Sequence, residues 1–240
     1  MATRQVQVYG VGNVQFRKNR RSKSIKLSIT HDGKVNVSLP SWVPYRFAER
    51  FVAQKRQWII QNKIDPVVMQ HGLKIGKLHT LIYKTSHTAA RATSRINNNE
   101  VIIFRPASNL ADTNQIHAVT QRAIDRALQI QAQALLANRL TDLAESNGFV
   151  YQAASIKKLK SRWGSCSHDK HIVLNRYLVQ LPWELIDYVI LHELVHTEIM
   201  QHGRPFWTEL AKYVDDLPSK RKRMRQQRPH IYTNIDQSVA

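Results

Sequence analysis

The stretch from Leu185 to His196 constrains this chain most, because it is almost wholly apolar yet carries two histidines and a glutamate. Such all-round hydrophobicity predicts a helix buried within a domain, where polar side chains are costly unless they are paired or bind a metal. His192 and His196 are four residues apart, so a helix would hold both imidazoles on one face, roughly 6 Å apart. Both rings can then reach one metal ion, with Glu193 beside it as a general base, which is the HExxH pattern.

The alternative for this stretch is a helix with two surface histidines and a solvated glutamate. Pro182 followed by Glu184 is typical of a first helical turn under either interpretation. The apolar flanks favour the metal site, because a surface helix would carry polar residues over more of its circumference.

A zinc site of this kind needs a third protein ligand and an open position for water. His202 is the first candidate, but it lies six residues beyond the second histidine, about 240° around an unbroken helix. The helix must therefore end first, and Gly203 and Pro205 supply a stop. Glu209 on the following helix is the alternative third ligand, and Glu198 is a weaker one.

Alternating apolar and polar residues in the N-terminal part predict strands with one wet face. The segment 6–16 predicts a strand pair with a glycine turn, and 25–29 and 35–39 predict a hairpin that turns at 31–34. We expect an antiparallel sheet, followed by an amphipathic helix at about 45–63. The apolar residues at helical spacing, which we expect in the core rather than on a base-stacking surface, are Phe47, Phe51, Trp58 and Ile59.

Further strands are predicted at 80–83 and 101–104, with a turn at 97–99 between them. A long helix follows from Asp112 to about Asn147, and the next residue, Gly148, is a stop signal. Beyond it, Ile156 and Leu159 are predicted to lie at the start of a strand. A turn at 168–171 and a returning strand at 172–174 follow.

These elements indicate an α+β fold in three parts. A β-rich N-terminal region covers 1–110, a core with the HExxH helix covers 111–217, and a basic tail covers 218–240. The tail contains the run Lys220–Arg228, which we expect to be a solvated segment, with contact to nucleic acid as the alternative.

Composition bounds the partners and the compartment. The chain has 240 residues, no apolar run of membrane-spanning length and no signal-peptide core near Met1. One cysteine, Cys166, excludes an internal disulfide and favours a reducing cytoplasm. The net charge of +19 predicts attraction to polyanions such as nucleic acid, although a generally basic proteome or a salt-adapted surface would have the same composition.

Several motifs in a fixed order resemble the YgjP-like metallopeptidase family, and the resemblance covers most of the chain apart from 75–110 and the C-terminal end. The motifs that carry it are Arg20–Lys26, Val35–Pro40, the Trp58 helix, Arg162–Cys166, Ile172–Asn175, Pro182–Val189, His192–His196, His202 and Phe206-Trp207. The resemblance implies a zincin fold related to SprT-like proteases, in which a β-rich N-terminal half precedes a zincin-like core.

The resemblance also implies roles for individual residues. His192, His196 and His202 would bind one catalytic zinc ion, and Glu193 would take a proton from the water that attacks a peptide carbonyl. An edge strand beside the active-site helix binds peptide in zincins, so 162–166 forms either part of that wall or only a packing surface. The candidates for contact with substrate or transition state are Arg162, Trp163, Gly164, Tyr188 and Arg204.

Two further side chains are candidates for the same site. Asp187 is a candidate to orient an imidazole from behind, although it is not on the face of the histidines. Cys166 is a weak candidate for a thiol nucleophile, because no matching histidine and asparagine pattern is identifiable.

Three functions follow as hypotheses. The favoured one is a cytoplasmic zinc metallopeptidase that acts on proteins or peptides without a membrane partner. The second is a nucleic-acid-associated protease of the SprT-like kind, which acts on DNA-bound proteins. The third is a nucleic-acid-binding module in which zinc only stabilises the fold.

Overall fold

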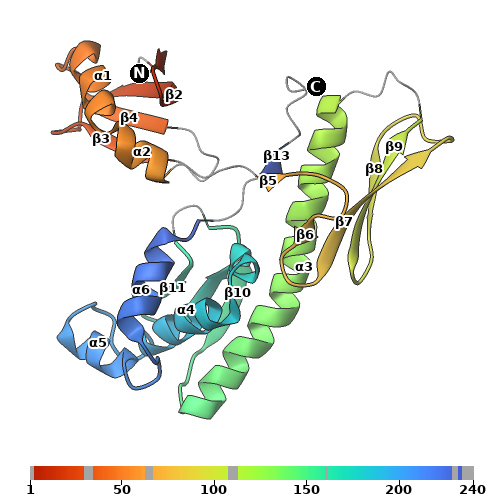
Figure 1. Ribbon diagram of the computed structural model, residues 1–240. Helices are drawn as coiled ribbons and strands as arrows, with labels where there is room; N and C mark the ends of the chain where they lie inside the picture. Colours follow the sequence, from red (N-terminus) through yellow and green to blue (C-terminus); the bar gives the residue numbers. More distant parts are fainter. Residues whose placement is uncertain are drawn as a thin grey trace. The chain divides into compact units, whose positions relative to one another are not determined.

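The computed structural model describes residues 3–29, 35–62, 67–107, 113–159, 162–228 and 232–233. The chain divides into two compact units, Met1–Val67 and Val68–Ala240, and Figure 1 shows their helices and strands. The division falls at Val67, earlier in the chain than the boundary expected at residue 110. Six α-helices and several small sheets in the described residues confirm the predicted α+β class.

The N-terminal unit is a four-stranded sheet with two helices. Its elements are β1 (Thr3–Val8), β2 (Gly12–Asn19), β3 (Lys26–Ile29), β4 (Val35–Pro40), α1 (Tyr45–Gln54) and α2 (Arg56–Asn62). The predicted strands are present, but the prediction of a purely antiparallel sheet is wrong, because β2 pairs in parallel with β4. The strand order is β1-β2-β4-β3, so β4 returns between its two predecessors. The hairpin turn predicted at 31–34 lies outside the described residues.

The helical part of this unit corrects the predicted core stripe. Ile59 is buried as expected, but Phe47 is 49% exposed and Trp58 is 44% exposed. The helix breaks at Lys55, which changes the phase of the apolar pattern between α1 and α2. The smaller Ala48 faces the core instead.

The second unit contains the remaining elements, with β5 (Val67–Val68) at the division. They are β6 (Lys74–Ile75), β7 (His79–Ser86), β8 (Thr93–Ile96), β9 (Glu100–Pro106), α3 (Thr113–Asn147), β10 (Ala153–Lys157), β11 (Gly164–Cys166), β12 (His171–Asn175), the 3-10 helix η1 (Arg176–Gln180), α4 (Trp183–Val195), α5 (Arg204–Leu210), α6 (Leu217–Gln226) and β13 (Tyr232–Thr233).

Helix α3 is the longest element of this unit and contacts both of its larger sheets (Figure 1). Its predicted C-terminal stop is confirmed. Gly148 adopts a φ of 74°, and the Phe149 N–H donates to Ala144 O at 2.9 Å, which caps the last turn. The predicted cap at Asp112 lies outside the described residues.

The first of these sheets has the order β6-β7-β9-β8. The strands predicted at 80–83 and 101–104 lie within β7 and β9, which pair in parallel. The predicted turn at 97–99 joins β8 to β9, and β8 itself was not predicted.

The second sheet has the order β10-β12-β11, which leaves β11 at the edge. The returning strand predicted at 172–174 is confirmed as β12, and it pairs in parallel with β10 and antiparallel with β11. Strand β10 begins at Ala153 rather than Ile156. Strand β11 contacts α4, so this edge lies beside the helix that carries the HExxH motif.

Helix α4 ends earlier than the sequence indicated. Its last residue is Val195, well before the predicted stop at Gly203. The Thr197 hydroxyl donates to Leu194 O at 2.7 Å and its N–H donates to the same oxygen at 2.9 Å, which closes the helix with a tight turn. Gly203 instead occupies the N-cap of α5.

The basic run near the C-terminus is also corrected. Residues 218–226, the first part of the basic tail expected at 218–240, belong to helix α6 (Leu217–Gln226), which contacts α4 and buries Met224. None of the described helices combines the length and the hydrophobicity needed to cross a bilayer.

Candidate metal centre

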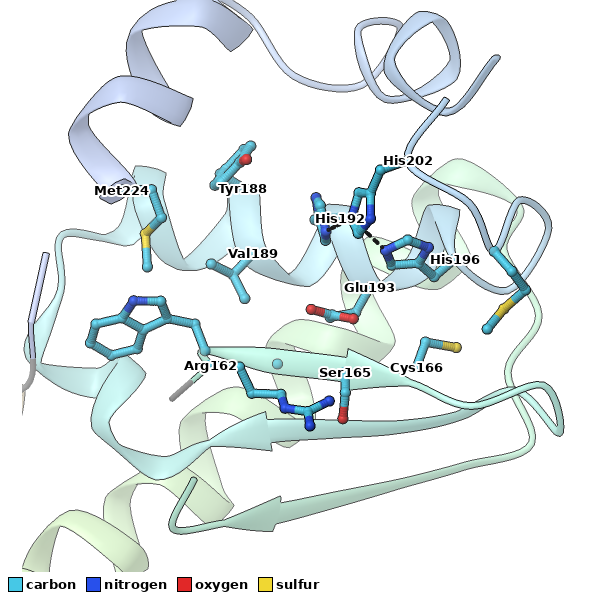
Figure 2. Close-up of a pocket in the computed structure, with 13 residues that line it drawn as sticks. Arg162, Ser165, Cys166, Tyr188, Val189, His192, Glu193, His196, His202 and Met224 are labelled. Atoms are coloured by element: carbon cyan, nitrogen blue, oxygen red, sulfur yellow. Dashed lines mark hydrogen bonds between the residues drawn. The ribbon is translucent and has the colours of Figure 1, made fainter. Parts of the chain in front are cut away.

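Three histidines from one helix and the loop after it meet at a single point (Figure 2). His192 lies in α4 and His196 caps it, and His202 follows in the loop before α5. The His202 Nε2 atom lies 3.0 Å from the Nε2 atom of each of the other two rings. Tetrahedral zinc with bonds of about 2.0–2.1 Å would space its ligand nitrogens by roughly 3.3 Å, so the three nitrogens are placed to share one ion.

Burial favours the neutral form of two of these imidazoles, His192 and His196. The pKa of His192 is lowered to about 3, first by desolvation and then by the charges of His196, His202 and Arg221. Desolvation also lowers the pKa of His196, partly opposed by its bond to Ile199. A neutral imidazole presents a lone pair, and three ring nitrogens that face one point could hold a metal ion between them.

Neighbouring groups orient the rings of the cluster. The His196 Nδ1–H donates to Ile199 O at 3.0 Å, which leaves Nε2 free to face the centre. The Trp207 Nε1–H donates to His202 O at 3.1 Å. Phe206, which is fully buried, packs its ring 4.5 Å from His196 and 4.8 Å from both other rings. The Phe-Trp pair of α5 therefore packs against the third histidine and restrains its ring.

Glu193 lies between the histidine cluster and strand β11 (Figure 2) and is only 5% exposed. Desolvation raises the pKa of Glu193 to about 8, and the nearby charge of Arg162 opposes this rise. A Cβ atom on Gly164 would lie 2.6 Å from Glu193 Oε1 and 2.7 Å from its Cγ. The glycine of β11 thus provides the space that the carboxylate occupies.

A cleft of about 450 Å³ opens over these groups (Figure 2). Its lining includes four of the predicted contact residues, Arg162, Trp163, Gly164 and Tyr188. The fifth, Arg204, is exposed at the start of α5 and is not among the described residues that line the cleft. The other lining residues, beyond Glu193 and the three histidines, are Ser165, Cys166, Val189, Met200 and Met224.

The structure moves the remaining ligand candidates away from the centre. Asp187 accepts two hydrogen bonds from Arg139 of α3, at 2.7 and 2.8 Å, so it does not orient an imidazole. Glu209 accepts from the Lys212 Nζ at 2.6 Å and from the Tyr213 hydroxyl at 3.0 Å. Among the described residues, neither Glu209 nor Glu198 belongs to the group that can hold a metal.

The thiol of Cys166 has the wrong ionisation for a nucleophile. Desolvation, with a smaller effect from the Glu193 charge, raises its pKa to about 11. The thiol is therefore protonated near neutral pH, whereas a nucleophilic cysteine needs a depressed pKa.

Met224 is the lining residue that sequence analysis missed most clearly. It stands in a basic run, and Arg223 and Arg225 on either side suggested a solvated segment. The available signal was the presence of one large apolar side chain within that charged run, which is typical of a helix anchored at one point.

Comparison with known proteins adds the family. A model described as "YgjP-like, metallopeptidase domain" matches residues 23–227. An uncharacterized protein of Methanocaldococcus jannaschii is 42% identical over 62 residues, which are 24% of this chain and 56% of that protein. The chain thus spans about half the length of this relative.

Two solved structures are also similar to part of the chain. The metallopeptidase zymogen of Methanocaldococcus jannaschii jannalysin is 28% identical, with a TM-score of 0.35 over 38% of this chain and 94% of that one. The metallopeptidase zymogen of Pyrococcus abyssi abylysin is 21% identical, with a TM-score of 0.35 over 41% of this chain and 100% of that one. Because the family match covers well over half of the sequence, this chain belongs to the YgjP-like metallopeptidase family.

Proposed function

We propose that this protein is a zinc-dependent peptidase whose metal is held by His192, His196 and His202. One observation carries the proposal. The Nε2 atom of His202 lies 3.0 Å from the Nε2 atoms of both His192 and His196, and the carboxylate of the neighbouring Glu193 is buried. Three neutral imidazoles are the ligand set of a catalytic zinc site that keeps one position open. Family membership supports a metal-dependent hydrolase of peptide bonds.

Glu193 acts as the general base in this proposal. A zinc ion supplies Lewis acidity here: it polarises a peptide carbonyl and makes nearby water easier to deprotonate. The Glu193 carboxylate accepts the proton of the attacking water and passes it to the departing amine.

The edge strand β11 binds the peptide backbone in this proposal. Gly164–Cys166 lines the cleft and pairs with β12 on one side only. An exposed edge offers unpaired N–H and C=O groups, and an extended peptide can add to it as a further strand. This position would hold the scissile carbonyl beside the histidine cluster.

The test is Glu193→Gln, measured by zinc content and by cleavage of a general peptide mixture. We expect zinc to be retained and the cleavage rate to fall by at least about 100-fold, because the proton acceptor is lost. Glu198→Gln is the matched control, since that carboxylate is exposed and lies outside the cluster. Unchanged cleavage by Glu193→Gln would reject Glu193 as the base.

The ligand assignment has its own test. His202→Ala should lower the bound zinc, measured by metal analysis after dialysis, and chelation should abolish cleavage by the wild-type protein. A variant that kept its zinc with unchanged affinity would show that the third ligand is another residue.

Association with nucleic acid is a second candidate function, favoured by one face of the N-terminal sheet. Residues 1–31 hold seven Lys or Arg, and the first acidic residue of the chain is Asp32. Phe16 of β2 is fully buried, so its neighbours Gln15 and Arg17 lie on the opposite, open face. A protein face that carries amide and cationic side chains but no carboxylates suits a polyanion, which offers phosphates and base edges.

Exposed aromatic rings in the same unit support this candidate. Trp42 is 77% exposed and Phe47 is 49% exposed, and the Arg46 guanidinium lies 5.2 Å from the Phe47 ring. Rings of this kind stack with unpaired bases.

Fluorescence polarisation with a single-stranded oligonucleotide tests this candidate. Affinity should fall steeply between about 50 and 200 mM salt. Arg17→Glu, on the open face of β2, should weaken binding more than Lys222→Glu, an equal change of charge on α6. Equal effects of the two substitutions would mean general charge attraction rather than a binding face.

A further inference from the structure

One end of the cleft is lined mainly by apolar and aromatic side chains. On one side of His192 (Figure 2), three residues line the cavity: Tyr188 and Val189 from α4 and Met224 from α6. Their exposed fractions are 7%, 4% and 8%. Trp163, the residue before Gly164 of β11, adds an indole to the lining. We name these four residues the α6 subsite.

The α6 subsite offers no carboxylate to pair with a cationic substrate side chain. Among the described residues that line the cleft, Glu193 is the sole carboxylate, and the proposed mechanism uses it. The positive charges of Arg221 and Arg225 act on Tyr188 from α6. A lysine or arginine entering here would be desolvated and repelled, whereas an apolar side chain would lose only its contact with water.

Two arginines of α6 that precede Met224 hold this helix against α4 and α5. Arg223 forms an ion pair with Glu184 in the first turn of α4. The Arg221 guanidinium stacks over the Trp207 ring, 4.0 Å from its centroid. The thioether therefore stands at a defined place in the wall of the cleft, and the adaptable shape of methionine suits contact with varied apolar side chains.

We propose that the α6 subsite binds an apolar substrate side chain, aliphatic or aromatic, immediately beside the scissile bond. This inference rests on the proposed peptidase function and names its substrate class. The mouth of the cleft lies against the edge of β11, so a peptide added to that edge presents its side chains alternately toward and away from α4. The residue next to the bond held at Glu193 points into the α6 subsite.

The experiment uses the full-length, zinc-loaded protein and a peptide library randomised on both sides of a cleavable bond. The wild-type protein should prefer Leu, Met or Phe over Ala and Lys by about 10- to 100-fold at one position adjoining the cleaved bond. Met224→Ala should reduce the Leu-over-Ala ratio at that position by about 10-fold and shift the preference toward larger rings. Met224→Gln, which keeps the length of the side chain, should lower the same ratio without opening a cavity.

Met200→Ala is the matched control, because Met200 lines the same cleft but is not part of the α6 subsite. It should change the ratio at that position by less than about twofold. Zinc content and the urea midpoint, measured for each variant, separate a change of specificity from a loss of fold.

The outcomes are distinguishable. If the wild-type protein cleaves without an apolar preference, or if both Met224 variants keep the wild-type ratio and lose only stability, the α6 subsite is overturned and the peptidase function stands. If the zinc-loaded wild-type protein cleaves no peptide, the proposed function fails and this inference fails with it.

Discussion

Gly164 shows how one residue of the edge strand determines the position of the proposed base. Glu193 has Oε1, Cγ and Cδ within 2.6 to 2.9 Å of the place where a Cβ of residue 164 would stand. The φ of Gly164 is not positive, so the backbone conformation at this position does not itself require glycine. It is needed because any side chain would displace the carboxylate.

Gly164→Ala should therefore lower kcat/KM by about 100-fold while zinc remains bound, since a base displaced by roughly 1 Å loses much of its effect. Steady-state cleavage and metal analysis on the same sample measure the two quantities. Gly203→Ala is the control, because its Cβ would meet Pro205 at 3.5 Å, an ordinary contact. Full activity of Gly164→Ala would mean that Glu193 is free to move or is not the base.

At the scale of elements, a buried glutamine ties α3 to the turn between β6 and β7. The Gln131 side chain is fully buried. Its Oε1 accepts from the backbone N–H groups of Lys77 at 2.6 Å and Leu78 at 3.2 Å. Its Nε2 donates to Ile75 O at 3.0 Å and to His79 Nδ1 at 3.2 Å. One side-chain amide thus provides hydrogen-bond partners for backbone groups of the turn that would otherwise be buried and unpaired.

Gln131→Leu should lower the free energy of unfolding by roughly 2–4 kcal/mol, because buried donors and acceptors lose their partner. Urea denaturation followed by circular dichroism measures this change. Gln133→Leu, at an exposed position of the same helix, should change stability by less than about 0.5 kcal/mol. A small loss in both variants would show that water replaces the amide without cost.

The same contact makes this element sensitive to pH. His79 is 3% exposed, its Nε2–H donates to Asn97 O at 3.0 Å, and its Nδ1 accepts from Gln131. This arrangement requires the neutral ring. Desolvation lowers the pKa of His79 below its ordinary value of 6.5, although the bond to Asn97 opposes the shift.

A lowered folded-state pKa means that the unfolded chain binds a proton more readily than the folded one. The stability from His79 is therefore complete above pH 6.5 and is lost as the pH falls through that value toward the folded-state pKa. Urea midpoints at pH 7.5 to 5, all with chelator to remove metal-linked protons, should fall less in His79→Gln than in the wild-type protein. Parallel curves would show that His79 is not the group responsible.

At the scale of the whole molecule, every residue of the candidate metal centre belongs to the second compact unit. The cleft lining runs from Arg162 to Met224, whereas the sheet proposed to bind nucleic acid belongs to Met1–Val67. The proposed chemistry and the proposed nucleic-acid face are thus separate parts of the chain.

A protein that begins at Val68 should bind one zinc ion and should lose oligonucleotide affinity by at least about 10-fold, because it lacks the basic sheet. Metal analysis and fluorescence polarisation on the two forms measure this, and a far-ultraviolet circular dichroism spectrum serves as the folding control. Loss of zinc from the shortened but folded protein would mean that the first unit is needed to form the metal site.

Local pattern was sufficient to predict the histidine cluster and most element positions. The spacing of His192 and His196 on an apolar helix is a property of helix geometry, and a strand such as β12 or a stop such as Gly148 depends on neighbouring residues alone. The exact helix stop was not predictable in the same way, because Thr197 ends α4 through its own hydrogen bonds well before the glycine and proline that signalled the end.

By itself, the sequence determined the α+β class, the HExxH helix and the third histidine as first candidate. Tertiary structure alone decided the parallel pairing of β2 with β4, the exposure of Phe47, the pairing of Asp187 with Arg139 and the entry of Met224 into the cleft. The physical reason is distance along the chain. Periodicity reports which face of an element is apolar, but which element covers that face depends on contacts between residues far apart in sequence.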